Sequence, residues 1–109
     1  MRRPELHLCD TVAELNEGAG EAVVAALRDG LAAGGGATIA LAGGATPRGA
    51  YQHIARRHAD LPWERIHVYW GDERYVRHDS PESNYRMARA TLLDHVPIPA
   101  LNVHPIPTD

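Results

Sequence analysis

An almost continuous apolar run, residues 37–42 (ATIALA), lies between two segments with helical spacing and limits the folds open to this chain. A run of this kind is typical of a strand that is covered on both faces, as in a parallel sheet. Further runs rich in apolar residues at 6–9 and 66–70 predict two more strands, and residues 102–104 are the candidate for a fourth. Because helical segments separate these runs, we expect an α/β fold with a mainly parallel sheet, about four strands and three helices.

Three segments show the spacing of amphipathic helices. The first is expected to be capped by Asp10 or Thr11 and to run to about residue 33, the second to span residues 47–58, and the third to end at Asp94. Helical spacing predicts the buried stripe of the first helix as Val12, Leu15, Ala19, Val23 and Leu27. The second helix is expected to bury Ala50, Tyr51, Ile54 and Ala55. With no flexible linker or internal repeat, residues 1–109 are expected to form a single domain.

The composition argues against several classes of function. A formal net charge of −3 predicts no strong attraction to nucleic acid. No apolar stretch is long enough to cross a membrane and no secretory segment follows the N-terminus, so a cytoplasmic location is expected. Cys9 is the only cysteine, which excludes a disulfide within the chain, and its apolar neighbours predict a small buried side chain.

The turn after residues 37–42 is suited to an anion. Gly43 and Gly44 let the backbone approach a ligand closely, while Thr46 is the expected N-cap and Pro47 the expected first residue of the next helix. The N–H groups of that helix end would then face a ligand beyond the strand, which favours phosphate. Since neither nucleotide-binding glycine motif is present, a phosphorylated small molecule is favoured, and a tight turn without a ligand is the alternative.

A second polar turn, residues 71–74 (GDER), follows the strand expected at residues 66–70. Asp72 and Arg74 are candidates to face a ligand, with Asp72 as a candidate base. The alternative is a surface turn with a local Asp–Arg pair. Because the two preceding strands are expected to be neighbours, the tips of the two turns are expected to converge.

The third helix opens with a polar segment. Ser80 or Ser83 is expected to cap this helix. Asn84 and Arg86 are candidates to reach a bound sugar, although capping alone would also explain a polar segment here.

Four motifs together resemble the glucosamine-6-phosphate isomerase/6-phosphogluconolactonase family: GGATPRGAY at residues 43–51, VYWGDERYV at 68–76, SNYRM at 83–87 and NVHPIP at 102–107. The resemblance implies a Rossmann-like three-layer fold, with this chain as its N-terminal portion. It also implies hydrolysis of 6-phospho-D-glucono-1,5-lactone to 6-phosphogluconate in the oxidative pentose phosphate pathway, without a cofactor. The WGDER turn resembles the lactonase version, which favours a lactonase over a glucosamine-6-phosphate deaminase or isomerase relative. A non-catalytic phosphosugar-binding module is a second alternative, and the sequence shows no helix-turn-helix or basic recognition helix in its favour.

The same resemblance implies the roles of individual residues. The residues that would hold the substrate are Gly43, Gly44, Thr46 and Arg48 at the phosphate, and Asp72, Arg74 and Asn84 at the sugar. Members of the family carry a later Gly-x-Asp-Gly-His motif with the expected catalytic histidine, and these 109 residues contain no Asp-Gly-His. The 109-residue chain alone is therefore expected to be inactive or nearly so.

Two further expectations concern partners and metals. An open sheet missing strands would expose an apolar edge, so self-association or pairing with a C-terminal portion is expected. The seven histidines form no short ligand pair backed by cysteine, so no metal site is expected.

Overall fold

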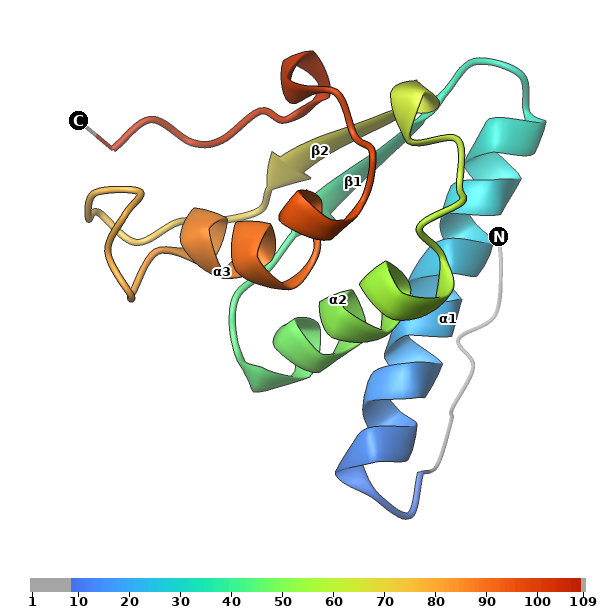
Figure 1. The fold of residues 1–109 in the computed structure, drawn as a ribbon, viewed down its shortest axis with the longest axis horizontal. Helices are drawn as coiled ribbons and strands as arrows, with labels where there is room; N and C mark the ends of the chain where they lie inside the picture. Colours follow the sequence, from blue (N-terminus) through green and yellow to red (C-terminus); the bar gives the residue numbers. More distant parts are fainter. Residues whose placement is uncertain (1–8, 109) are drawn as a thin grey trace.

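The structure, a computed structural model, describes residues 9–108, and within them three α-helices alternate with the two strands of one sheet (Figure 1). The elements in chain order are α1 (Val12–Ala32), β1 (Ala37–Leu41), α2 (Ala45–Arg57), β2 (Ile66–Trp70) and α3 (Asn84–Thr91). Short 3₁₀ helices are η1 (Trp63–Arg65), η2 (Leu93–His95) and η3 (Ala100–Asn102). No helix in this range combines the length and apolar character needed to span a membrane.

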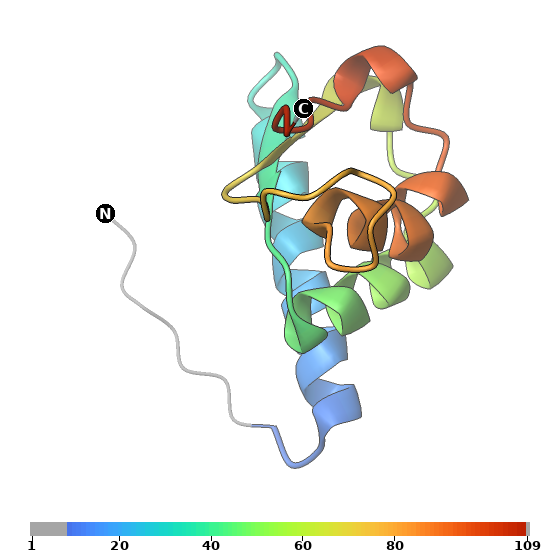
Figure 2. The same ribbon diagram turned by 90° about the vertical axis from the view of Figure 1, so that its left-hand side faces the viewer.

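The two strands run parallel, with Ala37 opposite Ile66 and Leu41 opposite Trp70. The connections that leave their carboxyl ends therefore emerge at the same end of the sheet (Figure 1). This alternation confirms the predicted α/β class. Helices α2 and α3 lie on one side of the strands (Figure 2). The core on that side joins both strands to all three α-helices, and its largest buried side chains are Trp63, Leu41, Ile54, Ile66 and Val68.

The opposite face of the sheet differs from the prediction. Thr38 and Ala40 of β1 are exposed, and Tyr69 of β2 is 45% exposed. Cover on both faces of β1, which the apolar run predicted, is therefore wrong for the described part of the chain. The free energy gained on burial scales with the apolar area that is removed from water, and the side chains of alanine and threonine have little apolar area. The face of β1 that carries Thr38 and Ala40 can therefore stay exposed at small cost.

The fourth predicted strand, residues 102–104, is reduced to a single parallel bridge between Val103 and Val68. The 3₁₀ turn η3 occupies the residues just before Val103, and Pro105 follows closely, so little extended backbone is left to pair. The prediction of about four strands is thus too high for residues 9–108, which contain two strands and this bridge. The strand predicted at residues 6–9 falls outside the described residues except for Cys9.

Cys9 contradicts its prediction, because it is exposed and belongs to no strand. It directly precedes the bend that leads into α1, and a Cβ placed at Gly18 would lie 4.0 Å from its sulfur. The Cys9 side chain thus lies beside the outer part of α1 and not in the core.

The buried stripe of α1 is also shifted from the predicted one. The buried residues are Gly20, Val24, Leu27 and Leu31, whereas Val12 is 72% and Leu15 is 42% exposed. The N-terminal turns of α1 extend past α2 and the sheet, so the first predicted stripe residues have no surface to cover (Figure 1). The helix begins as predicted, with the Thr11 hydroxyl accepting a hydrogen bond from the Glu14 N–H at 3.1 Å.

Glycine permits the close packing of α1 on α2. A Cβ at Gly20 would lie 2.8 Å from Cδ2 of His53 and 3.2 Å from the carbonyl oxygen of Ala50. A glycine destabilises a helix by about 1 kcal/mol relative to alanine. At Gly20 this loss accompanies the close packing of α2 on α1, which a side chain at this position would prevent. The predicted buried side of α2 is confirmed at Ala50, Tyr51 and Ile54, while Ala55 is half-buried.

Candidate functional site

The first loop joins β1 to α2 and is anchored by a tyrosine. The buried Tyr51 donates its hydroxyl proton to the carbonyl oxygen of Ala42 at 3.0 Å and accepts the Ala42 N–H at 2.8 Å. Burial raises the pKa of Tyr51 above its ordinary value, so the phenol remains a donor at neutral pH. Sequence patterning placed Tyr51 on the buried side of α2, but it gave no sign that the hydroxyl ties the loop to the helix.

Gly44 is the N-cap of α2, and its backbone has φ +108° and ψ 176°, a conformation that residues with side chains rarely adopt. The predictions that Thr46 is the cap and that Pro47 opens the helix are wrong, because the glycine lets the helix begin earlier, at Ala45. No side chain of residues 9–108 caps α2. Gly44 is exposed, and, its chain neighbours apart, a Cβ placed there would lie nearest to Cδ of Pro47 within residues 9–108, at 3.8 Å. The space around this helix end is therefore open.

The start of α3 is capped by two acceptors. Ser83 is the N-cap, as predicted, and its hydroxyl accepts the Arg86 N–H at 3.2 Å. The carboxylate of Glu73, from the turn after β2, accepts the N–H groups of Asn84 at 2.7 Å and Tyr85 at 2.8 Å, and the Ser83 hydroxyl at 3.1 Å. The sequence pattern indicated Asp72 and Arg74, the two neighbours of Glu73, and not Glu73 itself. It fixes the second loop to α3.

The hydrogen bonds also set the charge state of Glu73. Burial alone would raise its pKa, but the N–H groups of Tyr85, Asn84 and Arg74 and the Ser83 hydroxyl together hold the pKa of Glu73 below its ordinary value. The carboxylate is therefore ionised in the folded protein at neutral pH.

Replacing Glu73 with glutamine is expected to lower the free energy of unfolding at neutral pH by about 1–3 kcal/mol, because an amide turns an NH₂ group toward backbone donors. Since the folded-state pKa of Glu73 is depressed, its contribution is present above the unfolded pKa and lost as the pH falls through the folded value. Urea unfolding as a function of pH should therefore show the difference from wild type shrinking below pH 4.5, the ordinary value. Glu82→Gln, an exposed control in the same loop, should show little difference. If the free energy of unfolding of Glu73→Gln stays below that of wild type by the same amount at every pH, the ionised Glu73 carboxylate is not the source of the stabilisation.

The two loop tips meet through Asn84. This residue is 9% exposed, and its Nδ2 lies 3.4 Å from the carbonyl oxygen of Asp72. A Cβ at Gly43 would overlap its Oδ1 and lie 2.7 Å from its Cγ, so the amide also packs directly on the first loop. The Gly71 N–H donates to the carbonyl oxygen of Leu41 at 3.0 Å and extends the strand pairing into the loops. The predicted convergence of the tips is thus present at the carboxyl end of the sheet.

The remaining candidate side chains are exposed around this junction: Thr46, Arg48, Asp72 and Arg74. Thr46 and Arg48 belong to the first turns of α2, whereas Asp72 and Arg74 flank Glu73 in the second loop. The structure therefore brings Gly43, Asp72 and Asn84 into direct contact. It leaves the charged groups of Arg48, Asp72 and Arg74 facing solvent.

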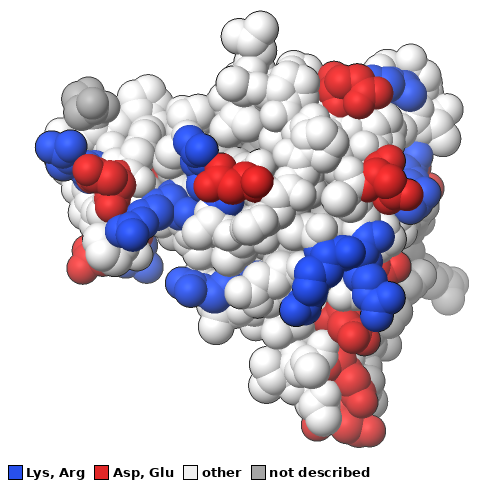
Figure 3. All heavy atoms as spheres, viewed as in Figure 1, with Lys and Arg blue, Asp and Glu red and all other residues white. Residues whose placement is uncertain are grey.

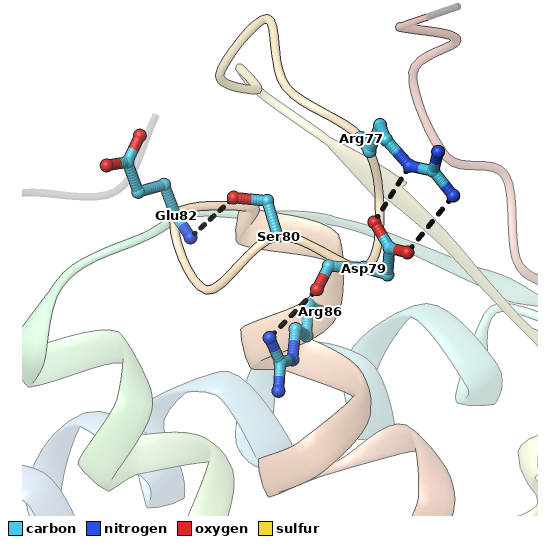
Figure 4. Close-up of polar contacts among 5 residues, drawn as sticks. All are labelled: Arg77, Asp79, Ser80, Glu82 and Arg86. Carbon is cyan, nitrogen blue, oxygen red and sulfur yellow. Dashed lines mark hydrogen bonds and ion pairs between the residues drawn. The ribbon is translucent and has the colours of Figure 1, made fainter.

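The segment that leads into α3 is held by local polar contacts (Figure 4). Arg77 donates from Nε and Nη2 to the two carboxylate oxygens of Asp79, at 3.1 and 3.2 Å. The Ser80 hydroxyl accepts the Glu82 N–H at 3.2 Å, and Arg86 donates from Nη1 to the carbonyl oxygen of Asp79 at 2.8 Å. Arg86, a candidate sugar contact by sequence, is thus engaged with the loop backbone.

Comparison with known proteins adds independent findings. The model of the family described as glucosamine-6-phosphate isomerases/6-phosphogluconolactonase matches residues 10–109. A 6-phosphogluconolactonase of Synechocystis sp. is 60% identical over 74 residues, which cover 68% of this chain and 30% of that protein. A 6-phosphogluconolactonase of Mycobacterium leprae is 42% identical over 89 residues, which cover 82% of this chain and 36% of that protein. The solved 6-phosphogluconolactonase of Trypanosoma cruzi has a TM-score of 0.85 and 34% identity, with 97% of this chain and 40% of that chain covered.

These matches confirm the resemblance of the sequence motifs and the predicted fold class. The chain spans only 30% and 36% of the length of the two curated relatives. The match of the family model includes both loops, the junction at Asn84 and the uncapped start of α2. By its sequence and its fold, the chain belongs to the family of glucosamine-6-phosphate isomerases and 6-phosphogluconolactonases.

Proposed function

We propose that the protein containing this chain hydrolyses 6-phospho-D-glucono-1,5-lactone to 6-phosphogluconate, a step of the oxidative pentose phosphate pathway. The observation that carries the proposal is the junction of the two loop tips at Asn84, where the start of α2, which no side chain of residues 9–108 caps, lies beside an acidic turn. The names of the relatives support the same reaction. Residues 1–109 are proposed to form part of one phosphosugar-binding α/β domain.

The phosphate of the substrate is proposed to bind at the N-terminal end of α2. Helices α1 and α3 begin with side-chain caps, whereas in the described part of the chain α2 follows its N-cap Gly44 without one. Its first-turn N–H groups and the positive end of its dipole therefore remain available to an anion. The exposed guanidinium of Arg48 adds a forked donor that suits phosphate. The proposed phosphate contacts are Gly43, Gly44, Thr46 and Arg48.

The lactone ring is proposed to lie over the second loop. In the reaction, water attacks the carbonyl carbon, the bond from this carbon to the ring oxygen breaks, and the departing oxygen takes up a proton. An oriented water, a proton acceptor and a stabilised oxyanion are therefore required. We assign the orientation of the water to the Asp72 carboxylate and contacts with the sugar to Arg74 and Asn84. The buried Asn84 acts in part by holding the two loops together.

These 109 residues contain no Gly-x-Asp-Gly-His segment, and no histidine of the chain replaces it by sequence context. A polypeptide limited to them is proposed to bind a phosphosugar weakly and to hydrolyse the lactone little faster than buffer does. A phosphate clamp contributes by positioning the reacting carbon, and it does not supply the proton transfer.

The test follows 6-phosphogluconate formation by the complete protein, above the spontaneous rate in buffer. Lactone hydrolysis well above that rate, with no ammonia released from glucosamine 6-phosphate, is the expected result. Ammonia release would instead identify a deaminase, and phosphosugar binding without any turnover would identify a non-catalytic module. The 109-residue polypeptide is assayed in parallel, and strong turnover by it contradicts its assignment as the binding part alone.

A further inference from the structure

A cluster of one carboxylate and two imidazoles lies at the end of α2 that is remote from Gly44. Glu21 of α1 places its Oε2 2.7 Å from Nε2 of His53 and 2.5 Å from Nε2 of His58. The three ligand atoms lie within 4.8 Å of one another. The two imidazole rings meet edge to face, with centroids 6.0 Å apart. Three side chains from two helices thus point at one position.

The core of the protein holds both imidazoles in place. His53 is 7% exposed, and its ring fits against α1 only because Gly20 has no Cβ. His58 ends α2, where its N–H donates to Ile54 at 2.8 Å and its carbonyl oxygen accepts the indole N–H of Trp63 at 3.2 Å. Trp63 is 1% exposed, so the backbone of His58 is fixed to the core. Ligands positioned by the fold in this way need little reorganisation to bind an ion.

We propose that Glu21, His53 and His58 form a binding site for a divalent transition-metal ion of the zinc class, which joins α1 to the C-terminal end of α2. Two imidazole nitrogens and a carboxylate oxygen are ligands that Zn²⁺ takes, with the fourth position left to water. Zn–N distances are about 2.0–2.1 Å, so the ion would occupy roughly the place of the Glu21 oxygen. The Glu21 side chain is 55% exposed and can withdraw toward solvent to make room.

The charge around the cluster is mixed. Figure 3 shows basic atoms over the C-terminal end of α2 and acidic atoms along α1 below it. The hollow at the cluster is lined by Glu21, His53, Arg57 and His58. The guanidinium of Arg57 opposes a bound cation, so Arg57→Gln is expected to tighten zinc binding.

No metal site was expected from the sequence because no short histidine pair is backed by a cysteine. Glu21 is 32 residues from His53 and 37 residues from His58, and no cysteine takes part. Only the packing of α2 on α1, which Gly20 permits, brings the three together.

The test is a zinc titration of the purified, chelator-treated protein in competition with a chromophoric chelator. One equivalent is expected to bind to wild type. His58→Gln and Glu21→Gln each remove a ligand and should weaken binding by more than the roughly 10- to 100-fold that loss of an outer-shell partner costs. His95→Gln is the matched control, because His95 is an exposed histidine whose Nε2 is hydrogen-bonded to the backbone carbonyl oxygen of Ala90 at 2.8 Å. This variant should bind zinc like wild type.

A second measurement does not depend on the variants. Paramagnetic Co²⁺ added to wild type should shift and broaden the ring-proton signals of His53 and His58 before those of the other histidines. The proposal is overturned if wild type binds no stoichiometric zinc, if both cluster variants bind it like wild type, or if Co²⁺ acts on other histidines first. The cluster would then be a hydrogen-bonded ion pair between α1 and α2. None of these outcomes bears on the lactonase assay.

Discussion

Replacing Gly43 with alanine is expected to lower kcat/KM for lactone hydrolysis by about 10²-fold, because misplacement of catalytic groups by about 1 Å has this effect. A Cβ at this position would overlap Oδ1 of Asn84 and lie 2.7 Å from its Cγ. Asn84 is buried and short, so it can yield only by leaving the carbonyl oxygen of Asp72. The free energy of unfolding should fall by about 1–3 kcal/mol, as in other overpacked sites.

A double-mutant cycle separates the collision from other effects of the substitution. Asn84→Ala removes the atoms that the new Cβ meets, so Gly43→Ala should cost much less stability in that background. Gly35→Ala is the matched control, since a Cβ at Gly35 meets nothing within 4 Å. Equal losses of stability from Gly43→Ala with and without Asn84 would show that the two loops are not joined through this amide.

The parallel arrangement explains how much of the site could be predicted from sequence. An apolar run followed by glycines predicts where a strand ends, and neighbouring parallel strands end at the same side of the sheet. The positions of Gly43 and Asp72 on adjoining loop tips follow from these two rules. The capping preference of serine likewise predicted a cap at Ser80 or Ser83, and the cap is Ser83.

The features that were missed depend on contacts between distant residues. The carboxylate of Glu73 caps a helix that begins 11 residues further along the chain, and its charge alone does not reveal the acceptors or donors nearby. The hydroxyl of Tyr51 reaches back 9 residues to Ala42. In each pair one residue lies in a loop and the other in a helix, so neither the helical nor the strand period of the sequence indicates these bonds.

The stripe of α1 was misplaced for a related reason. Several residues of this helix are apolar or small, and helical spacing allows more than one stripe. The buried stripe is determined by the position of α2, which packs on α1 where Gly20 permits close approach. Val12 and Leu15 lie outside this contact and are exposed. The sequence shows which faces are apolar, but only tertiary packing selects the face that is buried.

Replacing Asp72 with asparagine is expected to lower kcat for lactone hydrolysis by about 10²-fold, the cost of misplacing a reacting group, here the water that Asp72 is proposed to orient. KM should change little, because the proposed phosphate contacts lie on the other loop. The Asp72 side chain is exposed, and within residues 9–108 its carboxylate accepts no hydrogen bond, so the free energy of unfolding should stay within about 0.5 kcal/mol of wild type. Asp60→Asn, at another exposed aspartate, is the matched control for the loss of one charge.

The separate effects of Asp72→Asn on kcat and on KM distinguish two possible roles of the Asp72 carboxylate. A carboxylate that orients or deprotonates the attacking water acts mainly in the transition state, so its loss lowers kcat and kcat/KM together. A carboxylate that only binds the sugar ring would raise KM and leave kcat unchanged. If Asp72→Asn keeps the wild-type kcat, the water is activated from outside this loop, and the junction at Asn84 then serves substrate binding alone.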